Sequence, residues 1–357
     1  MKKCSLVRIL IVVIMATGAY QAQAQDEYRD IAEYEKLGQC SMTFLDIDVG
    51  ARSVGMGGVY TCIDNDVNAM FGNLAGIAGI KGGALSLSNT QWIADINQYG
   101  LAAAFGTGKF GTFGLSFVYF DNGELERTIP TKDLEVYPEG FYTDGTFTVN
   151  QWVAGLAYGR QITNKFSVGG QVKYCYEDLG TTDIKEPTFD DSTGLWTGYE
   201  LIEDAENING IVAFDFGTLY YFGLKDLRIG MSLRNFSQEV TYAFETFSLP
   251  INYRIAVAMN VLSLVPGIEH HDLQLSIATV SPYDGGERIH LGGEYKYLDL
   301  ISFRAGYRSN TDVGAFSAGF GLSPNAFGSL GLQFDYAYSE TDRAIGAIHR
   351  YTLGFSF

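Results

Sequence analysis

Glycines concentrate between positions 50 and 58, where they first suggest a loop that binds phosphate. The run reads Gly50-Ala51-Arg52, then Gly55-Met56-Gly57-Gly58 after two intervening residues. A phosphate-binding loop ends in Gly-Lys-Ser or Gly-Lys-Thr and leads from a strand into a helix. Neither feature is present, so these glycines need another physical reason.

Oxygen-bearing side chains at Asp64, Asp66 and Asn68 have the spacing of a calcium loop. The glycine and the closing glutamate of such a loop are replaced by Ala69 and Ala75. Asp and Asn are good N-caps, so a short helix beginning near Asp64 is the better interpretation. No Cys-x-x-Cys or Cys/His spacing indicates zinc. The sequence predicts no metal and no cofactor.

The four histidines lack the patterns of hydrolytic enzymes, since neither His-Glu-x-x-His nor Gly-x-Ser-x-Gly occurs. His271 and Asp272 could form an acid/base pair, but neighbouring residues of a strand point to opposite faces. His290, Glu294 and Lys296 share one face of a predicted strand, which indicates a polar interior network. We therefore expect no catalytic residues and no enzymatic activity.

Composition narrows the class of protein further. The 357 residues include 43 Gly, 23 Tyr and 24 Phe, with only 18% charged residues and a net charge of −17. A protein that binds a polyanion needs clustered Lys and Arg, and no such cluster occurs along the sequence. Nucleic acid is thus not an expected partner.

The first 24 residues have the features of a secretory signal peptide. A basic start and a short apolar stretch precede Ala22-Gln23-Ala24, so cleavage is expected near Ala24. Three cysteines then remain, Cys40, Cys62 and Cys175. A bridge between Cys40 and Cys62 is one alternative, and buried free thiols are the other.

Alternation of apolar and polar residues is the main pattern after position 80. Tyr351, Leu353, Phe355 and Phe357, for example, alternate with small or polar residues. Such a segment is a strand with one apolar and one polar face. Many of the segments are long enough for a tilted membrane crossing, and an even number can close into a barrel. The fourteen predicted strands are 82–89, 97–107, 109–121, 147–162, 165–178, 208–222, 226–238, 251–264, 271–282, 286–298, 300–309, 313–323, 327–340 and 347–357.

The polar faces and the connections give the barrel a predicted inside and two ends. The expected lumen-facing charges are Lys173, Arg228, Arg234, Glu294, Arg304, Arg308 and Asp335. Short turns at 163–165, 297–301 and 323–327 are expected on the periplasmic side. The two long connections, 121–146 and 177–207, are strongly acidic and are expected outside the cell. They are interpreted as solvated loops, with binding of a divalent ion or a partner left open.

Residues 44–80 carry a family resemblance. They resemble the N-terminal signature of the PorV/PorQ family of outer-membrane barrels, which are related to FadL-type transporters. In that family Phe-Leu precedes Gly-Ala-Arg-x-x-Gly-Met-Gly-Gly, an Asp-containing helix start and an Asn-Pro-Ala-Gly-Leu turn. Leu74 and Ile77 depart from this pattern, at the Pro and Leu of the turn. The matching residues are Phe44, Leu45, Gly50, Ala51, Arg52, Gly55, Met56, Gly57, Gly58, Asp66, Ala69, Asn73, Ala75 and Gly76.

The resemblance implies three parts and a function. They are a signal peptide (1–24), a hatch folded into the lumen (25–80) and an all-β, 14-stranded outer-membrane barrel (81–357). Glycines of the hatch would then permit close backbone approach in a crowded lumen. The family implies a docking or assembly component of type IX secretion, with the translocon or secreted cargo as partners. A FadL-like channel for hydrophobic small molecules is the alternative.

The C-terminal residues Tyr351, Leu353, Phe355 and Phe357 resemble the assembly signal of outer-membrane barrels, an aromatic end preceded by alternating apolar residues. The expected partners are therefore the barrel assembly machinery and membrane lipids. The expected location is the outer membrane of a Gram-negative cell.

Overall fold

A computed structural model of the chain describes residues 38–189, 196–242, 245–311, 313–324, 330–341 and 346–357. The predicted signal peptide, its cleavage site at Ala24 and residues 25–37 of the expected hatch lie outside the described residues. Among the described residues, no helix is long and apolar enough to cross a membrane.

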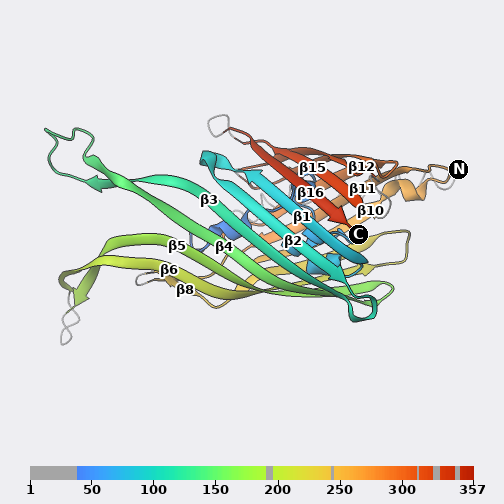
Figure 1. Ribbon diagram of the computed structural model, residues 1–357, viewed down its shortest axis with the longest axis horizontal. Coiled ribbons are helices and arrows are strands. Elements are labelled where there is room, and N and C mark those ends of the chain that lie inside the picture. Colours follow the sequence, from blue (N-terminus) through green and yellow to red (C-terminus); the bar gives the residue numbers. More distant parts are fainter. Residues whose placement is uncertain (1–37, 190–195, 243–244, 312, 325–329, 342–345) are drawn as a thin grey trace, which may run out of the picture. The chain divides into compact units, whose positions relative to one another are not determined.

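Fourteen antiparallel strands close into one barrel, which confirms the predicted fold class (Figure 1). Strands adjacent in the sequence are neighbours in the barrel, with β7 paired to β10 and β1 paired to β16 to close the ring. The barrel strands are β1 (Gly82–Gln91), β2 (Asn97–Gly106), β3 (Thr112–Pro130), β4 (Phe141–Thr163), β5 (Phe166–Phe189), β6 (Trp196–Tyr221), β7 (Arg228–Ser237), β10 (Asn252–Asn260), β11 (His271–Pro282), β12 (Arg288–Tyr297), β13 (Ile301–Arg308), β14 (Phe316–Leu322), β15 (Gly331–Ser339) and β16 (Ile348–Ser356).

The two long connections differ from the expected loops. Strands β3 and β4 continue as a paired hairpin to Pro130 and Phe141, and β5 and β6 continue to Phe189 and Trp196. Register shifts near Asp121 mark where the first hairpin leaves the barrel wall. Acidic composition hid these extensions, although Thr, Tyr, Phe and Ile between the charges favour strands. A small hairpin of β8 (Val240–Tyr242) and β9 (Glu245–Phe247) was also not predicted.

The barrel has two different ends. The β3–β4 and β5–β6 hairpins extend at one, here called the long-hairpin end, and the turn at 163–165 lies at the other, the short-turn end (Figure 1). The turn at 298–300 is also at the short-turn end, because strand direction alternates around the ring. The third expected short turn, 323–327, falls partly outside the described residues. The separation of short turns from long connections was thus predicted correctly.

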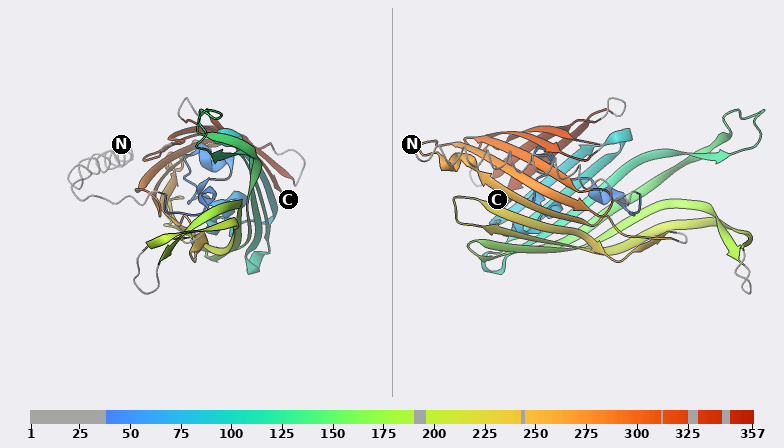
Figure 2. Two further views of the ribbon diagram at one scale, coloured as in Figure 1. Left: turned by 90° about the vertical axis from the view of Figure 1, so that its left-hand side faces the viewer. Right: turned by 180° about the vertical axis from the view of Figure 1, so that it is seen from behind.

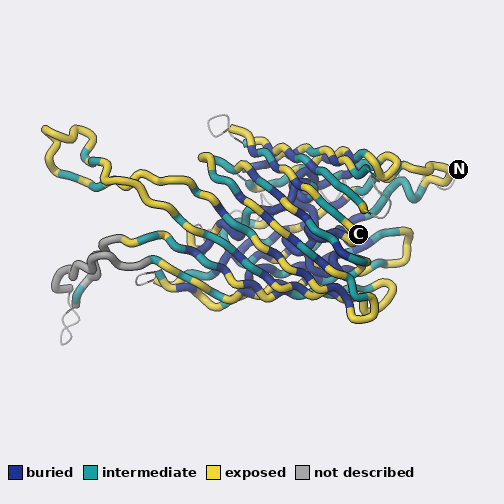
Figure 3. Tube along the Cα trace, in the orientation of Figure 1, coloured by how far each residue is buried: buried dark blue, intermediate teal, exposed yellow. Residues whose placement is uncertain are grey.

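Exposure alternates along the strands, so the barrel wall has an apolar outside and a polar inside (Figure 3). On β3 the exposed residues are Phe113, Leu115 and Phe117, whereas the intervening Thr112 and Ser116 are buried. An outward apolar band is the surface that an outer-membrane barrel presents to lipid. All seven charged residues expected to face the lumen do so, because their side chains are buried or only partly exposed.

A charge on the outer face should destabilise the barrel. Leu115 is 55% exposed on the outer face of β3, within the stretch that pairs with β2 in the barrel wall. We predict that Leu115→Arg makes the free energy of folding into lipid vesicles less favourable, by up to about 2–4 kcal/mol, the cost of an arginine at the bilayer midplane. Urea titration of folding into vesicles measures this change. Asn164→Arg, in a short turn, is the control, and an equal loss in both variants would contradict the assigned lipid face.

Candidate functional site

Residues 38–80, here called the inner segment, lie within the ring of strands (Figure 2, left). The segment has four short helices: η1 (Thr43–Asp46), α2 (Ala51–Gly55), η2 (Val67–Phe71) and η3 (Leu74–Ile77). Its apolar side chains pack with inward residues of the wall, among them Ala102, Ala104 and Ala157. Small residues on the wall thus leave the lumen open to the larger side chains of the segment.

Two of the helices begin with side-chain caps: the helix expected near Asp64 is capped by Asp66, whereas the cap at Asn73, in the expected turn, was not predicted. The carboxylate of Asp66 accepts a hydrogen bond from the backbone N–H of Asn68 and starts η2. The side-chain oxygen of Asn73 accepts one from Ala75 and starts η3. Asn73 also donates to the carbonyls of Thr61 and Thr218, at 2.6 and 2.9 Å. Asn73 therefore joins the inner segment to β6.

The glycine run lies where backbone of the inner segment touches backbone of the wall. Gly57 has φ of +68°, and an added Cβ would meet the Leu291 carbonyl at 2.7 Å and the Tyr307 nitrogen at 2.9 Å. From the other side, a Cβ on Gly306 would overlap the backbone of Gly57. Gly58 leaves room for the Arg308 guanidinium. The reason expected for these glycines, close backbone approach, is thus the one observed.

Arg52 forms the central ion pairs between the inner segment and the wall. Its Nε and Nη2 donate to the two carboxylate oxygens of Glu294, at 2.9 and 2.7 Å, and its Nη1 donates to Asp66 at 2.9 Å. Arg304 donates both to Glu294 and to Asp335, at 2.7 and 2.6 Å. A two-pronged arginine–carboxylate pair fixes orientation as well as distance. This network sets the position of α2 against β12 and β13.

Asp66 remains ionised within this network. Burial acts to raise the pKa of Asp66, but the Arg52 guanidinium and the hydrogen bonds from Asn68 lower it, and the net effect is a pKa below its usual value. Removing one partner from a buried ion pair costs about 3–5 kcal/mol, because the other charge stays buried without compensation. The Arg52–Asp66 pair therefore also holds the helix cap of η2 in place.

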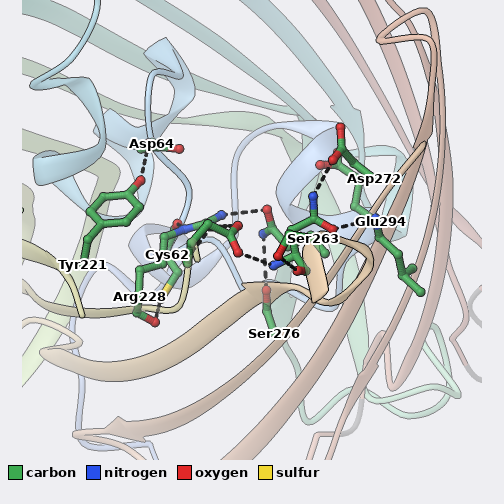
Figure 4. A network of polar contacts seen from close by, with 12 residues as sticks. Cys62, Asp64, Tyr221, Arg228, Ser263, Asp272, Ser276 and Glu294 are labelled. Atoms are coloured by element: carbon green, nitrogen blue, oxygen red, sulfur yellow. Dashed lines mark hydrogen bonds and ion pairs between the residues drawn. The ribbon is translucent and has the colours of Figure 1, made fainter. Parts of the chain in front are cut away.

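A second network lies between the inner segment and strands β6, β7, β10 and β11 (Figure 4). Arg228 donates to the Cys62 carbonyl at 2.7 Å, to Asp226 at 2.8 Å and to Gln274 at 2.7 Å. Tyr221 donates a hydrogen bond to Asp64. Asp64 is thus held by the wall and does not form a calcium loop with Asp66 and Asn68.

The other residues of the motif also contact the wall or the folded segment. The Ala51 N–H donates to Thr352 Oγ1 at 2.9 Å, Met56 is fully buried, and a Cβ on Gly76 would overlap the Ile63 carbonyl. Gly50 has φ of +94° where α2 begins, and Gly55 lies against Arg304 and Gly319. Ala75 packs with Cys62 in a buried cluster. Each motif residue therefore has a packing or hydrogen-bonding role.

The remaining chemical candidates do not converge. His271 Nδ1 pairs with Tyr295 on one face of β11, and Asp272 accepts from Asn260 on the other. Cys40, Cys62 and Cys175 are free thiols, so the alternative of a Cys40–Cys62 bridge is wrong in this structure. Within the described ranges, no group of three or more His, Cys, Asp or Glu side chains could hold a metal ion.

Sequence reasoning placed Lys173 and Arg308 in the lumen but missed their partners there, Asp215 and Asp48. Asp48 binds Arg254 on β10 and Arg308 on β13, at 3.3 and 2.8 Å. Lys173 on β5 binds Asp215 on β6 at 2.7 Å. Alternation marks Arg254 and Asp215 as inward residues, but it does not reveal which distant strands their partners occupy.

Two cavities adjoin the inner segment. A hollow of about 590 Å³ opens at the short-turn end and is lined in part by Asp64, Lys81, Asn164 and Tyr221. A cavity of about 40 Å³ lies farther inside, beside Phe44 and Phe120. The first is polar and open, and the second has room for only a few water molecules.

The C-terminal strand completes the barrel. Phe357 exchanges two backbone hydrogen bonds with Gly83, at 2.8 and 2.9 Å, and its ring lies over the space that a Cβ on Gly83 would fill. Tyr351, Leu353 and Phe357 point outward, as their alternation predicted, and Phe355 is partly exposed.

Comparison with known proteins gives one family and one fold. Residues 141–355 match the family model of the type IX secretion system membrane protein PorP/SprF. No curated protein matches the chain by sequence.

Solved structures of similar fold include the Ralstonia pickettii toluene transporter TbuX, with 14% identity, 86% of this chain and 97% of that chain covered, and a TM-score of 0.53. The P. putida toluene transporter TodX has 12% identity, coverage of 86% and 98%, and a TM-score of 0.55. A Pseudomonas aeruginosa FadL homologue has 11% identity, coverage of 86% and 98%, and a TM-score of 0.51. At these identities the likeness shows the FadL-type barrel fold alone.

Close backbone approach at Gly306 should be required to seat the inner segment. We predict that Gly306→Ala displaces the segment, because the new Cβ overlaps the Gly57 backbone. In protein carrying Cys40→Ser and Cys175→Ser, the buried Cys62 thiol should then react much faster with a maleimide. Gly170→Ala is the matched control, since its Cβ would meet only ordinary contacts beyond 3.6 Å, the nearest at 3.7 Å. Equal Cys62 reactivity in both variants would contradict this role for Gly306.

Proposed function

Because the chain belongs to the PorP/SprF family of type IX secretion system membrane proteins, we propose that it is a non-catalytic outer-membrane barrel that docks exported proteins or assembles their secretion apparatus. The family model covers 141–355, and the PorV/PorQ-like motif lies before it, within 44–80. The motif adds a finer proposal, in which the chain performs a PorV/PorQ-like docking role. The partners are the type IX translocon or its secreted cargo.

Occupation of the lumen is the observation that carries this proposal. The inner segment is held at two places on the wall that lie four strands apart around the ring, through Asn73 at β6 and through Arg52 at β12. Buried ion pairs and close packing of backbone against backbone hold the inner segment in the lumen. Its release would leave several charges without partners. A barrel filled in this way is better suited to present surfaces than to conduct a solute. In this proposal residues 25–80 form a hatch that stays closed.

The hairpin of β3 and β4 offers one such surface. Strand β3 pairs with β2 only as far as Asp121, and β4 pairs with β5 only as far as Asn150. The outer edges of 122–130 and 141–149 therefore have no partner strand among the described residues. Such edges accept an extended segment of another protein by strand addition. At the tip, Leu134 and Val136 are each 62% exposed and provide apolar contacts.

A channel for hydrophobic small molecules is the second candidate function. The cavity beside Phe44, Val49, Phe71 and Phe120 favours it on one side, although Lys173, Asp215 and Arg234 also line this cavity. Its volume of about 40 Å³ is well below the roughly 150 Å³ of an apolar cavity that holds benzene. Transport would therefore need the inner segment to move, and the docking proposal requires no such step.

The proposed function also implies where the protein is located and how it is assembled. The signal peptide would be cleaved near Ala24, the barrel assembly machinery would insert the strands, and lipid would cover their apolar faces. The hairpins would then face the cell exterior. Their acidity and free edges suit a partner with basic and extended segments.

Charges at the tip of the β3–β4 hairpin should impair secretion without affecting the barrel. We predict that Leu134→Asp with Val136→Asp lowers surface display of type IX cargo about tenfold, equivalent to about 1.4 kcal/mol of lost binding. Surface labelling of cargo on intact cells measures the display, and the level of heat-modifiable barrel in the membrane serves as the folding check. Asn164→Asp at the short-turn end is the matched control. Normal display with the tip variant would overturn the docking role of this hairpin. If both variants lose display while the barrel persists, the effect does not belong to the tip.

The terminal phenylalanine should be needed for assembly beyond its contribution to packing. We predict that Phe357→Ala lowers the amount of folded barrel in the membrane more than Phe303→Ala, because only the terminal residue belongs to the proposed signal. The two residues are 67% and 58% exposed, so both substitutions remove similar lipid contact. Heat-modifiable migration of membrane fractions measures assembly, and equal levels would reduce Phe357 to a packing residue.

A further inference from the structure

Basic side chains gather in the lumen near the long-hairpin end, around Asp48 of the inner segment. Asp48 binds Arg254 and Arg308 directly, at 3.3 and 2.8 Å. Burial would raise the pKa of Asp48, but these arginines, together with Arg234 and His290, hold it far below its usual value. Arg350 acts electrostatically on both Arg308 and Asp48. The group, here called the arginine cluster, comprises Arg234, Arg254, Arg288, Arg308, Arg350 and His290.

Register explains why residues so far apart in sequence meet here. Arg254 on β10 is opposite Val280 on β11, and Val280 is opposite Arg288 on β12, so both arginines lie in one inward row. His290 is directly opposite Arg308 on β13. All four positions lie near the ends of their strands at the long-hairpin end. The cluster is therefore a product of strand pairing.

The cluster contains more positive than negative charge. Among the described residues, Asp48 is the carboxylate in ion-pair contact with these arginines, through Arg254 and Arg308, and Asp46 lies within electrostatic reach of Arg234 and Arg254, so the five arginines outnumber these two carboxylates. Buried charges in proteins are normally paired or bound to ions. Elsewhere in this lumen that rule is followed, since Arg52 and Arg304 are each shared between two carboxylates. In the arginine cluster, by contrast, the buried positive charges are not matched by carboxylates.

Several buried donors of the cluster also have no hydrogen-bond partner. His290 is 3% exposed, and neither ring nitrogen has a partner within the described part of the chain. Arg350 is also 3% exposed; it donates to Ser339 at 3.2 Å, and its Nε has no partner there. The Nε atoms of Arg234, Arg288 and Arg308 are also buried and have no hydrogen-bond partner among the described residues. Buried donors without partners, in a cluster where arginines outnumber carboxylates, favour binding of an anion.

We propose that the arginine cluster binds a phosphate group that enters from the long-hairpin end. Arginine matches phosphate oxygens with two parallel hydrogen bonds, and His290 supplies a further donor. A phosphate carries about −1.5 to −2 charge at pH 7, which offsets more of the excess than one carboxylate would. Arg288 and Arg308 are only partly buried, so the cluster is open to solvent on that side. This binding site is independent of the proposed docking function.

Binding of inorganic phosphate to the purified barrel in detergent tests the proposal. Titration calorimetry at constant ionic strength should detect binding to the wild type and at least tenfold weaker binding to Arg288→Gln and to Arg350→Gln. Arg288 is the safer variant for folding, because its side chain is partly exposed. Arg160→Gln, an exposed arginine near the short-turn end, is the matched control and should bind phosphate as the wild type does.

Three outcomes would overturn the proposal: no phosphate binding by the wild type, equal weakening by Arg160→Gln, or acetate binding as tightly as phosphate. Acetate tests whether a carboxylate is the ligand instead. A further arm compares inorganic phosphate with phosphatidic acid in mixed micelles. Tighter binding of the lipid would support a phosphorylated headgroup as the source, and equal or weaker binding would support free phosphate.

Discussion

Backbone hydrogen bonding in an apolar medium is the constraint on which the rest of this structure depends. Hydrocarbon offers no partner to an N–H or a carbonyl, so each strand in the membrane needs a neighbour on both sides. The ring satisfies this requirement only because β16 returns to β1, with Phe357 and Gly83 joined by two hydrogen bonds. Past the ring, β3 no longer pairs with β2, and β4 no longer pairs with β5. Water can form hydrogen bonds with the strand edges that are left free there.

Closure creates a second problem, because alternation directs every other residue into the lumen. Small residues such as Ala102 and Ala157 leave space there, and charged ones such as Glu294 and Arg304 need partners. The inner segment meets both needs, with apolar helices against the small residues and Arg52 beside Glu294. Its glycines bring backbone against backbone at Gly57 and Gly306. Packing and charge thus act together to hold the segment.

The same arrangement relates structure to the proposed function. A lumen occupied by bound backbone leaves the ends of the barrel as its working surfaces. The long-hairpin end has free strand edges, exposed apolar tips and, just inside, the arginine cluster with excess positive charge. Acidic hairpins outside and a cluster rich in arginine within would attract ligands of opposite charge to this end.

Strand alternation and turn length are local properties, and they were enough to predict the barrel, its fourteen strands and the two kinds of connection. The sequence also indicated a helix start near Asp66, Arg304 and Asp335 as inward charges, and the outward parity of the C-terminal residues, but not the helix cap at Asn73. Only the tertiary structure decided which inward charges meet: Arg52 with Glu294, Asp48 with Arg254 and Arg308, and five arginines in one region. Those contacts depend on strand register and on the path of the inner segment, and one strand's periodicity carries no information about either.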